Sequence, residues 1–237
     1  MNNSKLDYII KQVEGASTKI SPHELLSDIF ETGAIAVSNR FDTSKAAKLR
    51  EEKYQQIMTK YSTESQKQIC DIFAEILILL ANQVKDGFYD YLGELYMASN
   101  TGNKKAGQFF TPYHISELNA AVATNDKIIK LCKSEDEILS ISEPSCGSGG
   151  MVLAVAGILL NEYDFNIARN LYVECSDIDR RCVHMAYLQI GLAGIPAVVR
   201  WQNTLTKERW ERWETPAYIL QWPRFAERNL ISSLQKE

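Results

Sequence analysis

The sequence predicts an α/β fold, in which a helical region is followed by a parallel β-sheet with crossover helices. Apolar residues recur at helical spacing through residues 22–97, and no β-type alternation of useful length occurs before residue 130. Beyond that point, short apolar runs alternate with helix-like stretches, which is the order of β-α-β units. We therefore expect a helical N-terminal domain over residues 1–98 and an α/β domain over residues 107–237.

Four helices are expected in the first region. The first begins at Pro22, because Ser21 is a preferred N-cap residue and Glu24 completes a capping box. The second helix is expected at residues 44–60, where many charged residues indicate a solvated helix. The third is expected at 65–84 and is buried through a broad apolar stripe. The fourth is expected at 89–97 and is followed by a polar loop at 99–107.

The second region is expected to alternate strands and helices. The helix at residues 180–192 should be stopped by Gly191 and Gly194. Parallel strands are expected at residues 138–142, 171–175 and 197–201, a fourth at 218–220, and the other helix at 151–160.

Composition limits the classes of function. The 26 Lys and Arg against 30 Asp and Glu give a net charge of −4, which excludes a uniformly basic nucleic-acid binder and leaves a local basic face open. Five cysteines without a C-x-x-C pair, and three isolated histidines, predict no metal site and favour reduced thiols in the cytosol. No signal-peptide layout is present, and no apolar run approaches the roughly 20 residues of a membrane span. We expect a cytoplasmic protein with no membrane contact.

The strongest chemical signal is E-P-S-C-G-S-G-G at residues 143–150, between a predicted strand and a predicted helix. Its glycines allow a ligand close to the backbone, and the helix N-terminus favours negative charge. The G-x-G-G spacing matches neither the dinucleotide fingerprint nor the P-loop, which counts against a dinucleotide-dependent oxidoreductase. Glu143 would repel a pyrophosphate but suits a ligand with an ammonium group beside its carboxylate. The alternative interpretation is a plain glycine-rich turn.

A second candidate position is S-D-I-D at residues 176–179, after the second predicted strand. Nucleotide-binding folds hold ribose hydroxyls with a carboxylate there, so Asp177 is the candidate, and Ile178 can pack on an adenine face. Taken alone, an acid at this junction is more often a helix N-cap.

Three motifs in order, G-Q-F-F-T-P at residues 107–112, E-P-S-C-G-S-G-G-M at 143–151 and S-D-I-D, resemble those of N6-adenine DNA methyltransferases, specifically the modification subunit of type I restriction–modification systems. D-Y-L-G-E-L-Y at residues 90–96 is similar to the helix that precedes G-Q-F-F-T-P in such subunits. The resemblance implies a Rossmann-like S-adenosylmethionine-dependent methyltransferase fold acting on DNA. It also implies specificity and restriction subunits as partners, and leaves a homo-oligomer open.

The resemblance implies a set of residues that bind S-adenosylmethionine. The loop at residues 109–111 closes over the methionine end of the cofactor, which Glu143 and the glycines hold. Asp177 holds the ribose. Asn203 stands where the family usually has an Asp that binds the adenine amino group, and the Asn carbonyl oxygen can accept the same bond. Together with Ile178, the predicted cofactor-binding set is Phe109, Phe110, Thr111, Glu143, Pro144, Cys146, Gly147, Gly149, Asp177 and Asn203.

The catalytic position departs from the family. Its members carry N-P-P-[FY] after the fourth strand to hold the extruded adenine, and this sequence contains no N-P-P. The nearest match makes Thr215, Pro216 and Tyr218 the catalytic candidates, with few residues after them, so we expect a truncated sheet, a degenerate motif, or both. Two functions stay open: a DNA adenine-N6 methyltransferase, and a non-catalytic cofactor-binding or assembly module derived from one.

All four tryptophans lie between residues 201 and 222, interleaved with Lys and Arg. Such a mixture can form a stacking platform for nucleic acid. Alternatively, the tryptophans cover an exposed sheet edge, while Arg209 and Arg212 lie among glutamates on a solvated helix. The interleaved acids favour the second interpretation, because they reduce the attraction for phosphates.

Overall fold

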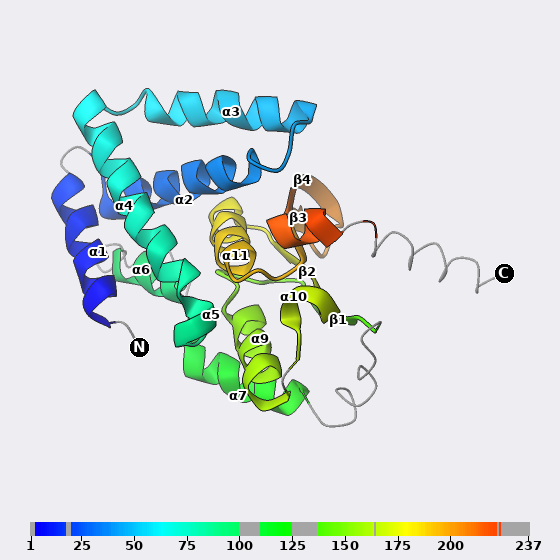
Figure 1. The fold of residues 1–237 in the computed structure, drawn as a ribbon. Helices are drawn as coiled ribbons and strands as arrows, with labels where there is room; N and C mark the ends of the chain where they lie inside the picture. Colours follow the sequence, from blue (N-terminus) through cyan, green and yellow to red (C-terminus); the bar gives the residue numbers. More distant parts are fainter. Residues whose placement is uncertain are drawn as a thin grey trace.

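The computed structural model describes residues 3–17, 20–99, 110–124, 137–163, 165–221 and 223. Helices pack beside a four-stranded sheet, with the N-terminal helices farthest from it (Figure 1). The predicted α/β class and the helical N-terminal region are therefore confirmed. None of the helices in these ranges is long and apolar enough to cross a membrane.

The helical region contains one more helix before Pro22 than the sequence predicts. The first helix buries Leu6, Ile9 and Val13, whose spacing of three and four residues places them on one face. The described helices of this region are α1 (Asn3–Ala16), α2 (Pro22–Ser38), α3 (Lys45–Met58), α4 (Thr63–Ala81), α5 (Gln83–Asp86) and α6 (Tyr91–Ser99).

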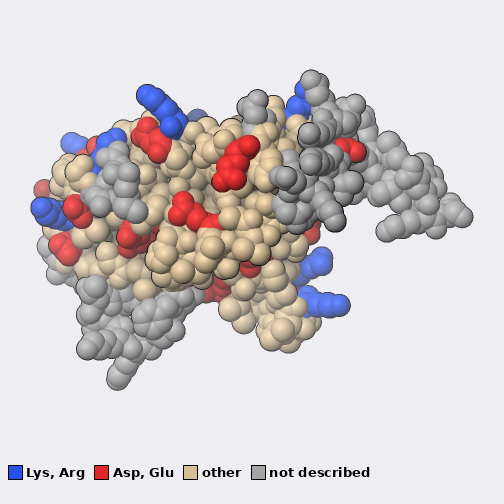
Figure 2. Space-filling model, turned by 90° about the horizontal axis from the view of Figure 1, so that it is seen from below, with Lys and Arg blue, Asp and Glu red and all other residues tan. Residues whose placement is uncertain are grey.

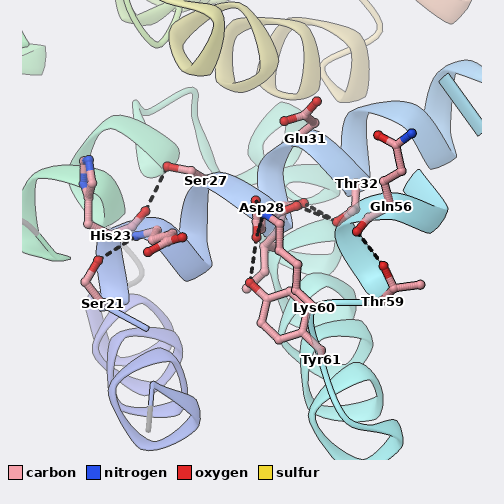
Figure 3. Close-up of polar contacts among 12 residues, drawn as sticks. Ser21, His23, Ser27, Asp28, Glu31, Thr32, Gln56, Thr59, Lys60 and Tyr61 are labelled. Atoms are coloured by element: carbon pink, nitrogen blue, oxygen red, sulfur yellow. Dashed lines mark hydrogen bonds and ion pairs between the residues drawn. The ribbon is translucent and has the colours of Figure 1, made fainter. Parts of the chain in front are cut away.

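The predicted helix start before α2 is confirmed, because the Ser21 hydroxyl accepts a hydrogen bond from the Glu24 backbone N–H at 3.2 Å. Helix α3 is mostly exposed, as its charge predicts, and α4 is buried along its apolar stripe. Polar contacts then fix these helices to one another. The Asp28 carboxylate on α2 accepts from Lys60 Nζ at 2.9 Å and from the Tyr61 hydroxyl at 2.7 Å, just beyond α3 (Figure 3).

The second region follows the predicted order of strands and helices. The three parallel strands and both crossover helices are confirmed, with boundaries within a few residues of those expected. The elements are α7 (Tyr113–Ala123), β1 (Leu139–Glu143), α9 (Gly150–Tyr163), α10 (Ile167–Asn170), β2 (Leu171–Asp177), α11 (Arg180–Leu192), β3 (Ala197–Asn203) and β4 (Glu208–Glu214), followed by a short helix at 216–221.

Sheet order determines where the helices lie. The order is β1-β2-β3-β4, and the first three strands are parallel. Each parallel strand lies next to the preceding one, on the same side, and crossovers between parallel strands are right-handed. The crossover helices α9 and α11 therefore cover the same face of the sheet. The helical region packs on that face, where α2 contacts α11. The helix at 216–221 lies on the opposite face, where Tyr218 packs on Val198 and Tyr172.

Two predictions for the end of the chain are wrong. Residues 218–220 are helical, and the segment expected as a solvated helix forms β4, antiparallel to β3. The two tryptophans of E-R-W-E-R-W-E lie three residues apart, a helical spacing, but a register shift opposite Trp201 leaves Trp210 as an extra residue in the strand. As expected, this tryptophan-rich segment covers the edge of β3.

One smaller detail also differs from expectation. Gly191 lies inside α11, and the turn after the helix is made by Gly194, whose φ is +72°. The proposed domain boundary stays a prediction, because residues 100–109 lie outside the described ranges, and one hydrophobic core includes residues from both regions.

Candidate functional site

A cavity of about 340 Å³ lies at the carboxyl end of β1, between the glycine-rich turn and the residues before α7. Its size falls in the usual range of small-molecule sites. Six residues of the predicted cofactor set contribute to its wall. The lining residues are Asp90, Phe110, Thr111, Ser116, Glu143, Ser145, Cys146, Gly147, Ser148, Gly150, Met151 and Asp177.

The glycines of the turn are required by its backbone and by its neighbours. Gly147 has φ +54°, and a Cβ there would lie 3.1 Å from the Phe110 ring. Gly149 has φ +97°, and its Cβ would lie 3.3 Å from the Ala186 backbone on α11. These positive φ values disfavour any side chain. The turn therefore packs tightly on both sides, and Gly147 keeps the cavity open beside Phe110.

Asp177 links β2 to the glycine-rich turn. One oxygen of its buried carboxylate accepts from the Gly147 backbone N–H at 2.9 Å, and the other accepts from the Asp179 N–H at 2.8 Å. Each oxygen keeps a further lone pair. The helix-cap alternative applies to the neighbouring acid, since Asp179 accepts from the Arg181 N–H at the start of α11. Asp177 thus holds the turn and faces the cavity.

Other members of the predicted set lie outside the cavity wall. Ile178 is 63% exposed beside Asp177, and its carbonyl accepts from Trp201 Nε1 at 2.9 Å. The Asn203 carbonyl oxygen, which the resemblance assigns to adenine, instead accepts from the N–H groups of Leu205 and Thr206 at 3.0 and 3.1 Å. The Pro144 carbonyl accepts from Thr204, Gly149 packs on α11, and Phe109 lies outside the described residues.

The three catalytic candidates are not brought to the cavity. The fully buried Thr215 hydroxyl donates to the Ile195 carbonyl at 2.8 Å and accepts from the Ala197 N–H at 2.9 Å. Pro216 begins the helix at 216–221, and Tyr218 is buried on the far face of the sheet. Thr-Pro therefore starts a helix, as Ser-Pro does before α2. The structure gives these residues a folding role in place of the predicted catalytic one.

A buried polar network, which no motif in the sequence predicts, holds Ser148 of the glycine-rich turn. The Asp90 carboxylate accepts from the Ser148 hydroxyl at 2.5 Å, from Gln189 Nε2 at 2.8 Å and from the Gly93 N–H at 3.0 Å. Burial raises the pKa of Asp90, against the effect of these three donors. The D-x-x-G spacing of Asp90 and Gly93 at the start of α6 is a helix-capping pattern. It is the signal in the sequence from which the capping role of Asp90 could have been predicted.

Cys146 has no features of a nucleophile. Its N–H donates to the Ser176 carbonyl at 2.9 Å, and its side chain is buried. The hydrogen bond with Cys175, together with burial, raises the pKa of the Cys146 thiol well above its usual value, so it stays protonated. Within the described ranges, no group of three His, Cys, Asp or Glu side chains is placed to hold a metal ion.

Removing the Asp90 carboxylate should destabilise the protein. In Asp90→Ala, the buried Ser148 hydroxyl and Gly93 N–H lose their partner, so we expect the free energy of unfolding to fall by about 2–6 kcal/mol, at about 1–3 kcal/mol for each of the two unsatisfied groups. Asp90→Asn keeps an acceptor and should cost less than half as much. Urea denaturation measures both, and equal losses would show that the charge matters more than the hydrogen bonds.

Comparison with known proteins gives three findings. Residues 81–236 match the family model described as N-6 DNA Methylase. The chain is 26% identical over 212 residues to the type I restriction enzyme MpnII methylase subunit of Mycoplasma pneumoniae, an alignment that covers 79% of this chain and 34% of that protein. The chain thus spans about a third of the length of this curated relative. A crystal structure from Listeria monocytogenes, described as a class I S-adenosylmethionine-dependent methyltransferase, aligns with a TM-score of 0.47 and 15% identity, over 83% of this chain and 53% of that one.

Proposed function

The chain belongs to the N-6 DNA methylase family, and on that premise we propose that it is the S-adenosylmethionine-binding part of a DNA adenine-N6 methyltransferase of restriction–modification type. The observation that carries this proposal is the cavity at the carboxyl end of β1, formed by the glycine-rich turn, Asp177 and Phe110. Open α/β sheets bind ligands at this end of their strands.

The cavity residues fit the methionine and ribose parts of S-adenosylmethionine. Glu143 offers a carboxylate to the ammonium group, and the N-terminus of α9 suits the methionine carboxylate. Asp177 has lone pairs left for ribose hydroxyls. For the adenine ring we propose the exposed Ile178 side chain in place of Asn203, whose carbonyl oxygen is already bonded within a turn.

Bound S-adenosylmethionine supplies an electrophilic methyl group. The role of this chain is to hold and orient it, with Phe110 and Thr111 on the wall opposite the glycine-rich turn. Transfer to adenine also needs an acceptor for the N6 protons and a ring against the extruded base. No N-P-P-[FY] occurs in the sequence, and the nearest match is buried elsewhere, so we propose that polypeptide outside this sequence supplies these groups.

The proposed setting follows from the family. We propose DNA as the substrate, specificity and restriction subunits as partners, and the cytoplasm as the site of action. Among the described residues, Cys70, Cys146 and Cys175 are reduced thiols, which suits a reducing compartment. The second candidate function is a non-catalytic cofactor-binding or assembly module. It is favoured by the buried position of Thr215 and Tyr218, which leaves the described chain without the family's catalytic groups at the cavity.

Asp177 should contribute to cofactor affinity. We expect Asp177→Ala to weaken S-adenosylmethionine binding by about 1.5–3 kcal/mol, the scale of hydrogen bonds to a charged group. Asp177→Asn keeps one acceptor for Gly147 and should lose less. Equilibrium dialysis with radiolabelled cofactor measures both, and circular dichroism verifies that the variants are folded. An unchanged affinity in Asp177→Ala would remove this residue from the site.

The proposed activity is tested with tritiated S-adenosylmethionine and mixed-sequence DNA. We expect the chain alone to transfer label to adenine at least 10²–10³ times more slowly than an enzyme with a complete motif, the cost of losing well-placed polar contacts. Addition of a polypeptide that carries the family's N-P-P-[FY] motif should restore the rate. Robust labelling by the chain alone would contradict this division of roles. Cofactor binding with no labelling in either reaction would favour the non-catalytic module.

A further inference from the structure

A second cavity, of about 530 Å³, adjoins the cofactor cavity on the side of α6 and α7. The two cavities share Asp90, Phe110 and Thr111. None of the residues of the glycine-rich turn lines the second cavity, so the cofactor proposed above does not account for it. Its remaining wall comes from residues 86–97 and 112–117.

Aromatic rings form much of this wall. The Tyr89 ring lies 5.1 Å from that of Tyr91 and 5.0 Å from that of Tyr113, so the three rings are contiguous. Phe88 and Phe110 also line the cavity. Faces and edges of such rings are the surfaces on which planar or cationic groups are held.

The charged residues of the wall are acidic. Asp86, Glu94 and Glu117 are exposed at the cavity, and the part of its lining that the structure describes contains no Lys or Arg. Burial raises the pKa of Tyr113, and the Glu117 and Asp90 carboxylates raise it further, as expected in a negative potential. Acidic side chains also occupy the middle of the face seen from below, where α5, α7 and α9 lie in Figure 1, while Lys and Arg lie toward its margins (Figure 2).

We propose that this cavity binds the guanidinium group of an arginine side chain on a partner protein. A guanidinium is planar, stacks on aromatic rings and binds carboxylates through two parallel hydrogen bonds, so it uses both features of the wall. The same carboxylates repel phosphates, which counts against a nucleic-acid backbone at this opening. The exposed acids place the opening at the surface, within reach of another protein. This inference goes beyond the proposed function and does not depend on it.

The probe is N-acetyl-L-arginine methylamide, which carries the side chain flanked by two amides, titrated into the full chain and followed by NMR. We expect saturable shifts of the Tyr89 and Tyr113 resonances. The citrulline counterpart has the same shape without the charge and should not bind, and the lysine counterpart should bind more weakly. Citrulline or lysine counterparts that bind as tightly would overturn the proposal. Free L-arginine binding tenfold more tightly would assign the cavity to an amino acid instead of a partner protein.

Variants of the wall locate the binding. Glu94→Gln and Tyr113→Leu should each weaken binding of the probe about five- to thirtyfold, the equivalent of about 1–2 kcal/mol. Tyr113→Phe keeps the ring and should retain binding. The matched control is Glu52→Gln, because Glu52 is an exposed acid on α3, away from the cavity.

Binding of S-adenosylmethionine should be unchanged in Glu94→Gln, which separates this site from the cofactor site. If Glu52→Gln lost as much affinity for the probe as Glu94→Gln, the overall charge of the protein would explain the loss, and the proposal would be overturned. Full binding by Tyr113→Leu and Glu94→Gln would also overturn it.

Discussion

Replacing Trp213 with alanine should lower the free energy of unfolding by about 3–5 kcal/mol, the usual cost of removing a large aromatic side chain from a core. Trp213 is 2% exposed, and its ring lies 5.2 Å from His184 and 5.3 Å from Tyr187 on α11. The Arg50 guanidinium of α3 lies over the same ring at 5.3 Å. Burial also lowers the pKa of His184 to about 3, so the contact between the His184 and Trp213 rings joins two neutral groups at pH 7.

The matched control is Trp210→Ala. Trp210 lies three residues earlier in β4 but is 39% exposed, so its loss should cost less than about 1 kcal/mol, as at most surface positions. Trp213→Phe should fall between the two. Guanidinium denaturation followed by circular dichroism gives all three values. Similar losses for the two alanine variants would contradict the assignment of Trp213 to the contact between β4 and the helical region.

Replacing Gly147 with valine should weaken S-adenosylmethionine binding by at least about 100-fold, or about 3 kcal/mol. A β-branched residue strongly disfavours the φ of +54°, and its Cβ would press on the Phe110 ring at 3.1 Å. The turn must then shift, which moves the Gly147 N–H away from Asp177. Both effects act directly on the wall of the proposed cofactor cavity.

Gly194→Val separates strain from binding. Gly194 also has a positive φ, +72°, but no neighbouring atom lies within 4 Å of a Cβ built there. Both variants should therefore lose stability, and only Gly147→Val should lose affinity for the cofactor. Thermal unfolding and cofactor titration of the two proteins provide the comparison. If Gly194→Val lost affinity to the same extent, general destabilisation would explain the result and the cavity would not be the cofactor site.

Local signals predicted much of the fold. The Ser21 cap and the apolar stripe of α4 are properties of short segments, and the parallel strands appear as short apolar runs between turns and helices. The end of the chain was harder, because the spacing of charges and tryptophans in residues 208–214 also suits a helix. Residues 208–214 form a strand because they pair with the edge of β3, with Trp210 as an extra residue. That pairing is a tertiary effect and leaves little trace in the segment itself.

The candidate site shows the same division. Six of the residues that line the cavity were identified from motifs, because a glycine-rich turn and an acid after the next strand must meet at one edge of a parallel sheet. Thr215 and Tyr218 were misassigned because a Thr-Pro helix start has the same letters as part of a degenerate catalytic motif. Asp90 and Gln189 lie far apart in the sequence, and only the fold brings them together beneath Ser148.

The most direct test of the central claim is isothermal titration of the chain with S-adenosylmethionine at two temperatures, with NAD as the control ligand. We predict saturable binding of one S-adenosylmethionine per chain, no binding of NAD, and loss of the S-adenosylmethionine signal in Gly147→Val. Absence of S-adenosylmethionine binding at both temperatures, in protein shown to be folded by circular dichroism, would contradict the assignment of the cavity at the carboxyl end of β1 to this cofactor.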